Sequence, residues 1–90
     1  MKTYTIDLNS VYNADELHAE IRGVLPVPEF YGNNLDALHD VLTDFHEPCR
    51  IEFRNLTEAE ITMPKYIRSL KKMCEDVMKE NEKVEIVFAG

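Results

Sequence analysis

Residues 28–40 read PEFYGNNLDALHD and lead from a proline-containing turn into the start of a helix. Asn33 or Asn34 can cap this helix, because a side-chain oxygen at its start can accept a hydrogen bond from a free N–H group of the first turn. Apolar residues then recur every three or four positions, which is the spacing of one helical face. We expect the buried stripe to consist of Leu35, Leu38, Leu42 and Phe45.

The opposite face of this helix carries a row of aspartates, Asp36, Asp40 and Asp44. Successive members stand four residues apart, so they repel each other by about 0.2–0.5 kcal/mol per pair. Asp44 also lies near the helix C-terminus, where the helix dipole disfavours negative charge. Such a row can be an ordinary solvated face, but the adjacent aromatic residues Phe30 and Tyr31 favour a surface that binds a basic partner.

Three short segments, at residues 4–8, 51–53 and 84–88, alternate between apolar and polar residues and predict strands. Helical patterns separate the strands, and crossover connections of this kind imply parallel pairing. Polar residues such as Thr5 and Glu52 interrupt the strands, so helices should cover only one face of the sheet. We therefore expect one α/β domain with a three-stranded parallel sheet and helices packed mainly on one face.

Capping patterns and prolines predict where the remaining helices begin. Asn13 and Glu16 have the spacing of a capping box before the first helix, and a short helix should begin at Thr57 with Glu60 in the reciprocal position. Pro64 should open the last helix. The apolar stripe of this last helix is Ile67, Leu70, Cys74 and Val77.

The composition narrows the classes of function. The 90 residues include 17 acidic and 10 basic ones, which gives a formal charge of −7. This charge disfavours direct binding of nucleic acid or an anionic membrane and favours a basic partner. No apolar stretch reaches the length of a membrane span or resembles a signal peptide, so we expect a cytoplasmic protein. Cys49 and Cys74 match neither a disulfide framework nor a zinc site, and should be reduced and buried.

Residues 28–38, PEFYGNNLDAL, closely resemble the signature of the barstar family, whose members are intracellular inhibitors of barnase-type ribonucleases. The resemblance extends to LHAEI at residues 17–21, to IEFR at residues 51–54 and to the final strand, so it covers nearly the whole chain. It implies a single barstar-like domain over residues 1–90 and a binding protein rather than an enzyme. The expected partner is a basic extracellular or toxin-like ribonuclease, and the free protein should be a monomer without a cofactor.

The resemblance also implies a mechanism, in which the second helix and the loop before it plug the active site of the ribonuclease. The carboxylate of Asp40 would replace an RNA phosphate among basic catalytic groups. The implied partner-binding residues are Phe30, Asn34, Asp36, His39, Asp40, Thr43, Asp44, Phe45 and Asp76. Four of these depart from the family pattern: Phe30 lacks a tyrosine hydroxyl, His39 and Phe45 replace tryptophans, and Asp44 replaces a glycine. A cognate ribonuclease of somewhat different shape from barnase is expected.

Two alternatives remain open at the level of sequence. The chain could be an acidic protein-interaction module that binds a basic target without inhibiting a nuclease. A metal-dependent enzyme is the other alternative, because Asp36, His39 and Asp40 lie on adjacent helical turns and His46 lies two turns beyond His39. No phosphate-binding glycine loop, nucleophile elbow or zinc motif accompanies them.

Overall fold

Three parallel strands form the sheet: β1 (Lys2–Asp7), β2 (Cys49–Arg54) and β3 (Val84–Phe88). The computed structural model describes all of residues 1–90. Strand β2 lies in the centre, and Ile51 pairs with Tyr4 of β1 on one side and with Ile86 of β3 on the other. The predicted three-stranded parallel sheet is confirmed.

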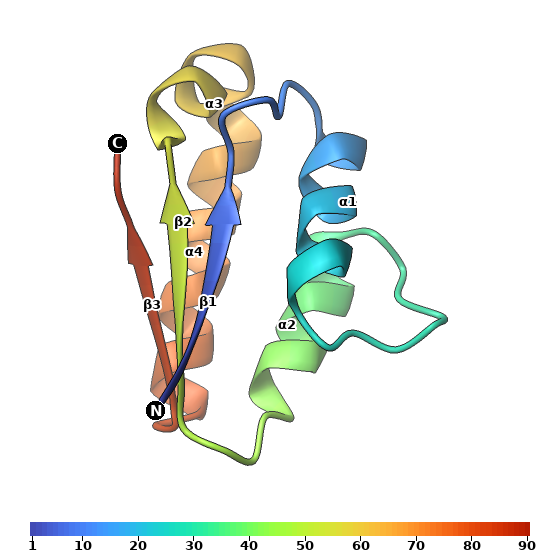
Figure 1. Cartoon of the computed structure of the whole chain (residues 1–90), viewed down its shortest axis with the longest axis vertical. Coiled ribbons are helices and arrows are strands. Elements are labelled where there is room, and N and C mark those ends of the chain that lie inside the picture. Colours follow the sequence, from blue (N-terminus) through green and yellow to red (C-terminus); the bar gives the residue numbers. More distant parts are fainter.

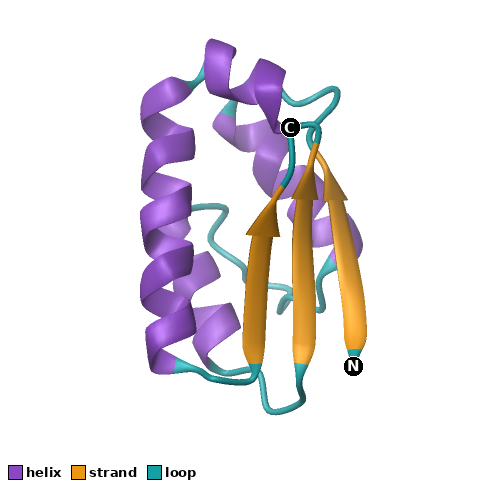
Figure 2. Cartoon of the chain, turned by 90° about the vertical axis from the view of Figure 1, so that its left-hand side faces the viewer, coloured by secondary structure: helices purple, strands orange, loops and turns teal.

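Four helices connect the strands: α1 (Ala14–Val24), α2 (Leu35–Thr43), α3 (Leu56–Thr62) and α4 (Pro64–Glu80). In Figure 1, α4 runs along the sheet, whereas α1 and α2 lie on the side of β1. Figure 2 shows that no helix stands in front of the strands when the sheet is seen from its open face. The expected α/β fold, with helices packed on one face, is therefore also confirmed.

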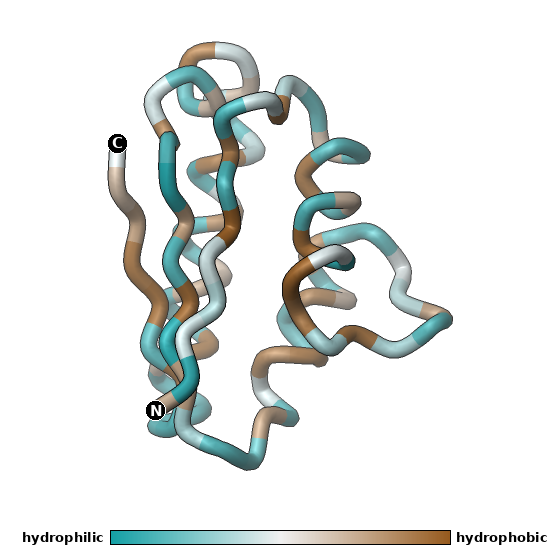
Figure 3. The backbone as a smooth tube through the Cα atoms, in the orientation of Figure 1, coloured by the Kyte–Doolittle hydropathy of each residue, from teal (hydrophilic) through white to brown (hydrophobic).

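The core lies between the covered face of the sheet and the helices. It contains 20 buried apolar residues, and along β2 the inward residues Ile51 and Phe53 alternate with polar outward ones. The same alternation is visible as brown and teal stretches along the strands in Figure 3. On the open face, Glu52 accepts hydrogen bonds from Arg50 and Arg54, so charged side chains cover the exposed side of the central strand.

Helix α4 follows its sequence pattern closely. It begins at Pro64, which suits the first turn because proline lacks an N–H group that would be unpaired there. Its predicted stripe is buried throughout: Ile67, Leu70, Cys74 and Val77. Cys74 and Cys49 are both free and buried, as expected. None of the four helices combines the length and the apolar character needed to cross a membrane.

The predicted start of α3 is wrong. The helix begins at Leu56, and the residue before it, Asn55, has a left-handed backbone with φ of 59° and makes no side-chain cap. The Asn55 side chain instead donates a hydrogen bond of 2.8 Å to Asp7 at the end of β1. Glu60 pairs with Lys71 of α4 rather than closing a capping box. Contacts with other elements have therefore replaced the local cap.

Candidate functional site

The loop at residues 25–34 and α2 form the first part of the candidate surface. Asn34 is the cap of α2: its Oδ1 accepts the Ala37 N–H at 2.8 Å, and its Nδ2 donates to the Gly32 carbonyl at 3.1 Å. The left-handed residue in this turn is Asn33, with φ of 52°, whereas Gly32 has no positive φ. Asn34 therefore shapes the junction between loop and helix through contacts within the chain.

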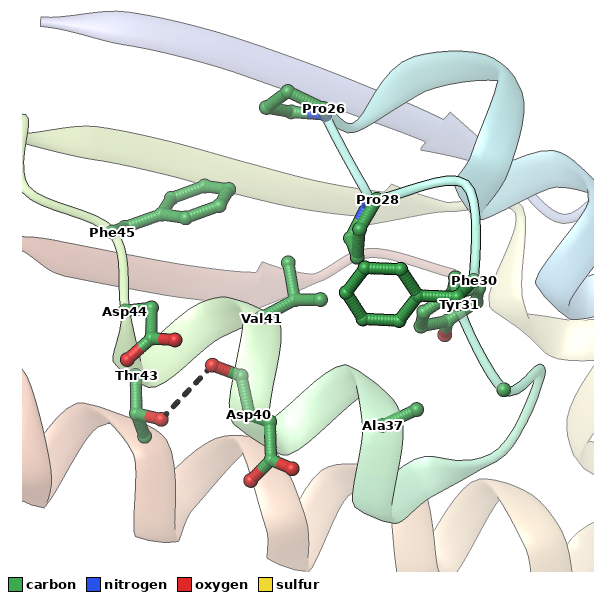
Figure 4. A pocket seen from close by; sticks show the side chains of 11 residues that line it. Pro26, Pro28, Phe30, Tyr31, Ala37, Asp40, Val41, Thr43, Asp44 and Phe45 are labelled. Atoms are coloured by element: carbon green, nitrogen blue, oxygen red, sulfur yellow. Dashed lines mark hydrogen bonds between the residues drawn. The ribbon is translucent and has the colours of Figure 1, made fainter.

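A groove of about 780 Å³ runs between this loop and α2. Figure 4 shows the prolines and aromatic residues of the loop on one side of it, and Val41 pointing toward them from α2. Phe30 is 88% exposed, which is unusual for a large apolar side chain and typical of a contact residue at an interface. Five of the nine expected partner-binding residues line this groove: Phe30, Asp40, Thr43, Asp44 and Phe45.

The aspartate row is exposed as predicted, and its members have different surroundings. The Asp40 side chain is 85% exposed, and the nearest basic atom is Nδ1 of His39, at 3.7 Å. Asp44 is the C-terminal cap residue of α2, and its backbone N–H donates to the Asp40 carbonyl at 3.3 Å. Asp40 and Asp44 line the groove, whereas Asp36 lies in a second hollow. Helix α2 thus places aspartate side chains both in the groove and in the second hollow.

This second hollow, of about 410 Å³, lies between α2 and α4. Three further predicted residues line it: Asp36, His39 and Asp76. Nε2 of His39 lies 2.6 Å from a carboxylate oxygen of Glu80, and this hydrogen bond raises the pKa of His39 above its usual range. Lys72 of α4 also borders the hollow, so it is less uniformly acidic than the groove.

Thr43 and Phe45 occupy the far end of α2. The Thr43 hydroxyl donates to the carbonyl oxygens of His39, at 2.9 Å, and Asp40, at 3.2 Å. Its side chain is therefore turned back onto the helix (Figure 4). Phe45 lies beyond the end of the helix and is half-buried against Tyr4, with ring centroids 6.3 Å apart. Phe45 thus joins the groove to the edge strand β1.

His18 is a buried residue that the sequence analysis did not identify. It comes from α1 and is fully buried, with its two ring nitrogens 2.7 Å from the hydroxyls of Tyr31 and Tyr66. Burial lowers the pKa of His18 and raises the pKa of Tyr31. A signal was present in the sequence, because His18 lies next to Leu17 and three residues before Ile21 on the apolar face of α1.

The geometry offers no support for the metal-enzyme alternative. The candidate ligands were Asp36, His39, Asp40 and His46, and no group of three histidine, cysteine, aspartate or glutamate side chains in the chain is placed to hold a metal ion. The surface combines exposed carboxylates with an exposed aromatic ring and an apolar groove. Such a combination can bind a protein that carries basic groups.

Comparisons with known proteins match nearly the whole chain. A family model described as "Barstar (barnase inhibitor)" matches residues 1–89. The chain is also similar to the "Putative ribonuclease inhibitor YrdF" of Bacillus subtilis (strain 168), with 27% identity over 81 residues. That alignment covers 89% of this chain and 89% of the relative.

Proposed function

Because the chain belongs to the barstar family, we propose that it inhibits a basic, barnase-type ribonuclease by inserting α2 and the loop before it into the active site. The family supports a role in ribonuclease inhibition, and the surface around α2 supports this particular way of binding. The chemistry of RNA cleavage belongs to the partner. The chain contributes shape, negative charge and an aromatic contact.

The observation that carries the proposal is the position of Asp40. Its side chain is 85% exposed in the middle of α2, beside the groove that Phe30 also lines. A carboxylate can accept paired hydrogen bonds from arginine in the same way as a phosphate oxygen pair. Asp40 therefore takes the place of an RNA phosphate among the basic catalytic groups of the ribonuclease.

The other residues surround this central contact. Phe30 packs onto the rim of the active site, Asp44 extends the acidic side of the groove, and Thr43 and Phe45 complete its end. Asp36, His39 and Asp76 contact basic residues of the partner from the second hollow. Asn34 acts at the interface mainly by capping α2, since the oxygen and the nitrogen of its side-chain amide both form hydrogen bonds within the chain.

The place in the cell where the inhibitor would act follows from the nature of its partner. A basic ribonuclease that is secreted or used as a toxin threatens the RNA of the cell that makes it, so an inhibitor protects that cell from within the cytoplasm before export. The formal charge of −7 suits such a partner, because long-range attraction accelerates association of oppositely charged proteins. The free inhibitor is a monomer whose acidic surface stays available.

The direct test is inhibition of RNA cleavage by the purified protein. Barnase and a panel of basic bacterial ribonucleases are each titrated with the protein while cleavage of a fluorogenic RNA is followed. We expect one member of the panel to lose activity at one equivalent of inhibitor. An unchanged cleavage rate for every basic ribonuclease, with the protein folded, would favour the non-inhibitory interaction module.

A further inference from the structure

His18, Tyr31 and Tyr66 form a triad around a buried imidazole that the proposed inhibition does not itself use. The ring of His18 lies between two hydroxyls, with Nδ1 2.7 Å from Tyr31 and Nε2 2.7 Å from Tyr66. The three residues come from different segments, namely α1, the loop at residues 25–34, and α4. One imidazole thus connects the loop to two helices.

Hydrogen bonding makes this connection specific. A neutral imidazole carries one N–H, so one hydroxyl donates to the ring and the other accepts from it. No buried side-chain nitrogen or oxygen in the chain lacks a partner, so the triad is fully satisfied. Removing either hydroxyl leaves one nitrogen of His18 buried without a partner, which is unfavourable.

The triad holds only one of the two aromatic residues in the loop. Tyr31 is 5% exposed and belongs to the core, whereas its neighbour Phe30 is 88% exposed to solvent. Arg22 of α1 adds a second attachment, because its Nη1 donates to the Tyr31 carbonyl and to Oδ1 of Asn33, each at 3.3 Å. Anchoring Tyr31 to α1 therefore leaves Phe30 exposed beside α2.

We propose that His18 is a positioning residue for the partner-binding surface: by holding the Tyr31 hydroxyl, it fixes the loop so that Phe30 remains exposed beside the groove. We call the contact between His18 and the Tyr31 hydroxyl the clamp, and its relevance to binding rests on the proposed function. A loop that is already ordered in the free protein loses less conformational entropy when a partner binds. The clamp itself is a property of the free protein.

Two matched variants separate this positioning role from a general contribution to stability. Tyr31→Phe and Tyr66→Phe each remove one hydroxyl from the same imidazole, but only the first releases the loop. Amide hydrogen exchange of the free protein is measured at residues 27 and 31, whose N–H groups bond to the carbonyls of Leu25 and Pro28. Amides within α4 report global unfolding in the same experiment.

We expect Tyr31→Phe to accelerate exchange at residues 27 and 31 by about tenfold or more, and Tyr66→Phe to change it by less than about twofold. The α4 amides should show similar losses of protection in both variants. Equal acceleration of loop exchange in the two variants, or no acceleration in either, would overturn the positioning role. Because no ribonuclease is present, this result is independent of the inhibition test, and failure of one proposal can be told from failure of the other.

Discussion

Among individual residues, Asp40 has the combination of features that the proposed inhibition requires. It lies too far into α2 to be stabilised by the positive end of the helix dipole, and its side chain is 85% exposed. Asp36, one turn before it, lies in the first turn, where a carboxylate is favourable for folding alone. Asp44 caps the opposite end. The position of Asp40 is thus better explained by binding than by stability of the helix.

Asp40→Ala should separate binding from folding. The free energy of unfolding should stay within about 0.5 kcal/mol of the wild type or rise, because alanine favours the helix and repulsion from Asp36 and Asp44 disappears. Binding to the inhibited ribonuclease should weaken by about 2–5 kcal/mol or more in free energy, since basic groups of the partner would be buried without a counter-charge.

Asp44→Ala is the matched control at the edge of the same row. We expect its affinity loss to stay below about 1 kcal/mol, as for most charges at the rim of an interface. Urea unfolding and titration calorimetry on both variants give the comparison. Equal, small losses of affinity would mean that the row is only a solvated face.

The histidines His18 and His39 should give the stability of the protein opposite dependences on pH. Burial lowers the pKa of His18 below the ordinary 6.5, so its contribution is fully present above that pH and is lost as the pH falls toward the folded pKa. The hydrogen bond to Glu80 raises the pKa of His39, so its contribution is present below 6.5 and is lost as the pH rises through the folded pKa.

Glutamine variants test these signs separately. On going from about pH 8 to about pH 5.5, the free energy of unfolding of His18→Gln should rise relative to the wild type, because the cost of protonating a buried imidazole is gone. That of His39→Gln should fall relative to the wild type over the same change. Urea unfolding at both pH values measures the differences. A shift of the same sign in both variants would contradict the assigned environments.

At the scale of the elements, α2 depends on its cap as well as on its buried stripe. Leu38 and Leu42 are the two buried residues of this nine-residue helix, so its first turn relies strongly on Asn34. Short helices of this length are marginal without such tertiary and capping interactions. The cap therefore determines whether the first acidic turn of the surface stays ordered.

Asn34→Ala should lower the free energy of unfolding by about 0.5–2 kcal/mol, because the Ala37 N–H loses its acceptor. Asn34→Asp keeps an oxygen at that position and should lose much less. As a control, Asn13→Ala removes the equivalent cap of α1, far from the groove, and should be comparably destabilising without loosening α2. Urea unfolding with hydrogen exchange resolves the sites, and full retention of stability in Asn34→Ala would count against the cap.

The elements that could be predicted from sequence are those whose signals are local and repeated. The stripe of α4 and the alternation in the strands each involve several residues with one period, so single exceptions do not hide them. The predicted capping oxygen of α1 is also observed, since Oδ1 of Asn13 accepts the Glu16 N–H at 2.9 Å. The start of α3 could not be predicted, because the Asn55 side chain forms a hydrogen bond with Asp7, which is distant in sequence.

The exposed acidic row of the candidate site was predictable from the sequence. The way in which the loop and the helices surround that row was not. The period of the helix places Asp36, Asp40 and Asp44 on the outer face, and all three are exposed. Their division between two hollows depends on how the loop and α4 flank α2, which no local pattern encodes. The buried contact between His18 and Tyr31 joins residues 13 positions apart and was missed for the same reason.

At the scale of the whole molecule, the sheet and its core act as a support for the loop and α2. All three strands bury one face under the helices, and α2 packs mainly against α4. The loop and α2 lie together on one side of the molecule, away from β3 (Figure 1). A rigid base with a projecting acidic edge is suited to entering a concave active site, because little ordering is needed on binding.

The central claim is that this edge occupies the active site of a ribonuclease, and competition for that site tests it most directly. The ribonuclease identified by the inhibition titration is saturated to different degrees with a mononucleotide that binds its active site, and the affinity of the inhibitor is measured at each level. We predict that the apparent affinity falls in proportion to the fraction of free active sites, because the Asp40 carboxylate and the nucleotide phosphate need the same basic groups. An affinity that is unchanged at full nucleotide saturation, with a ternary complex formed, would contradict the claim.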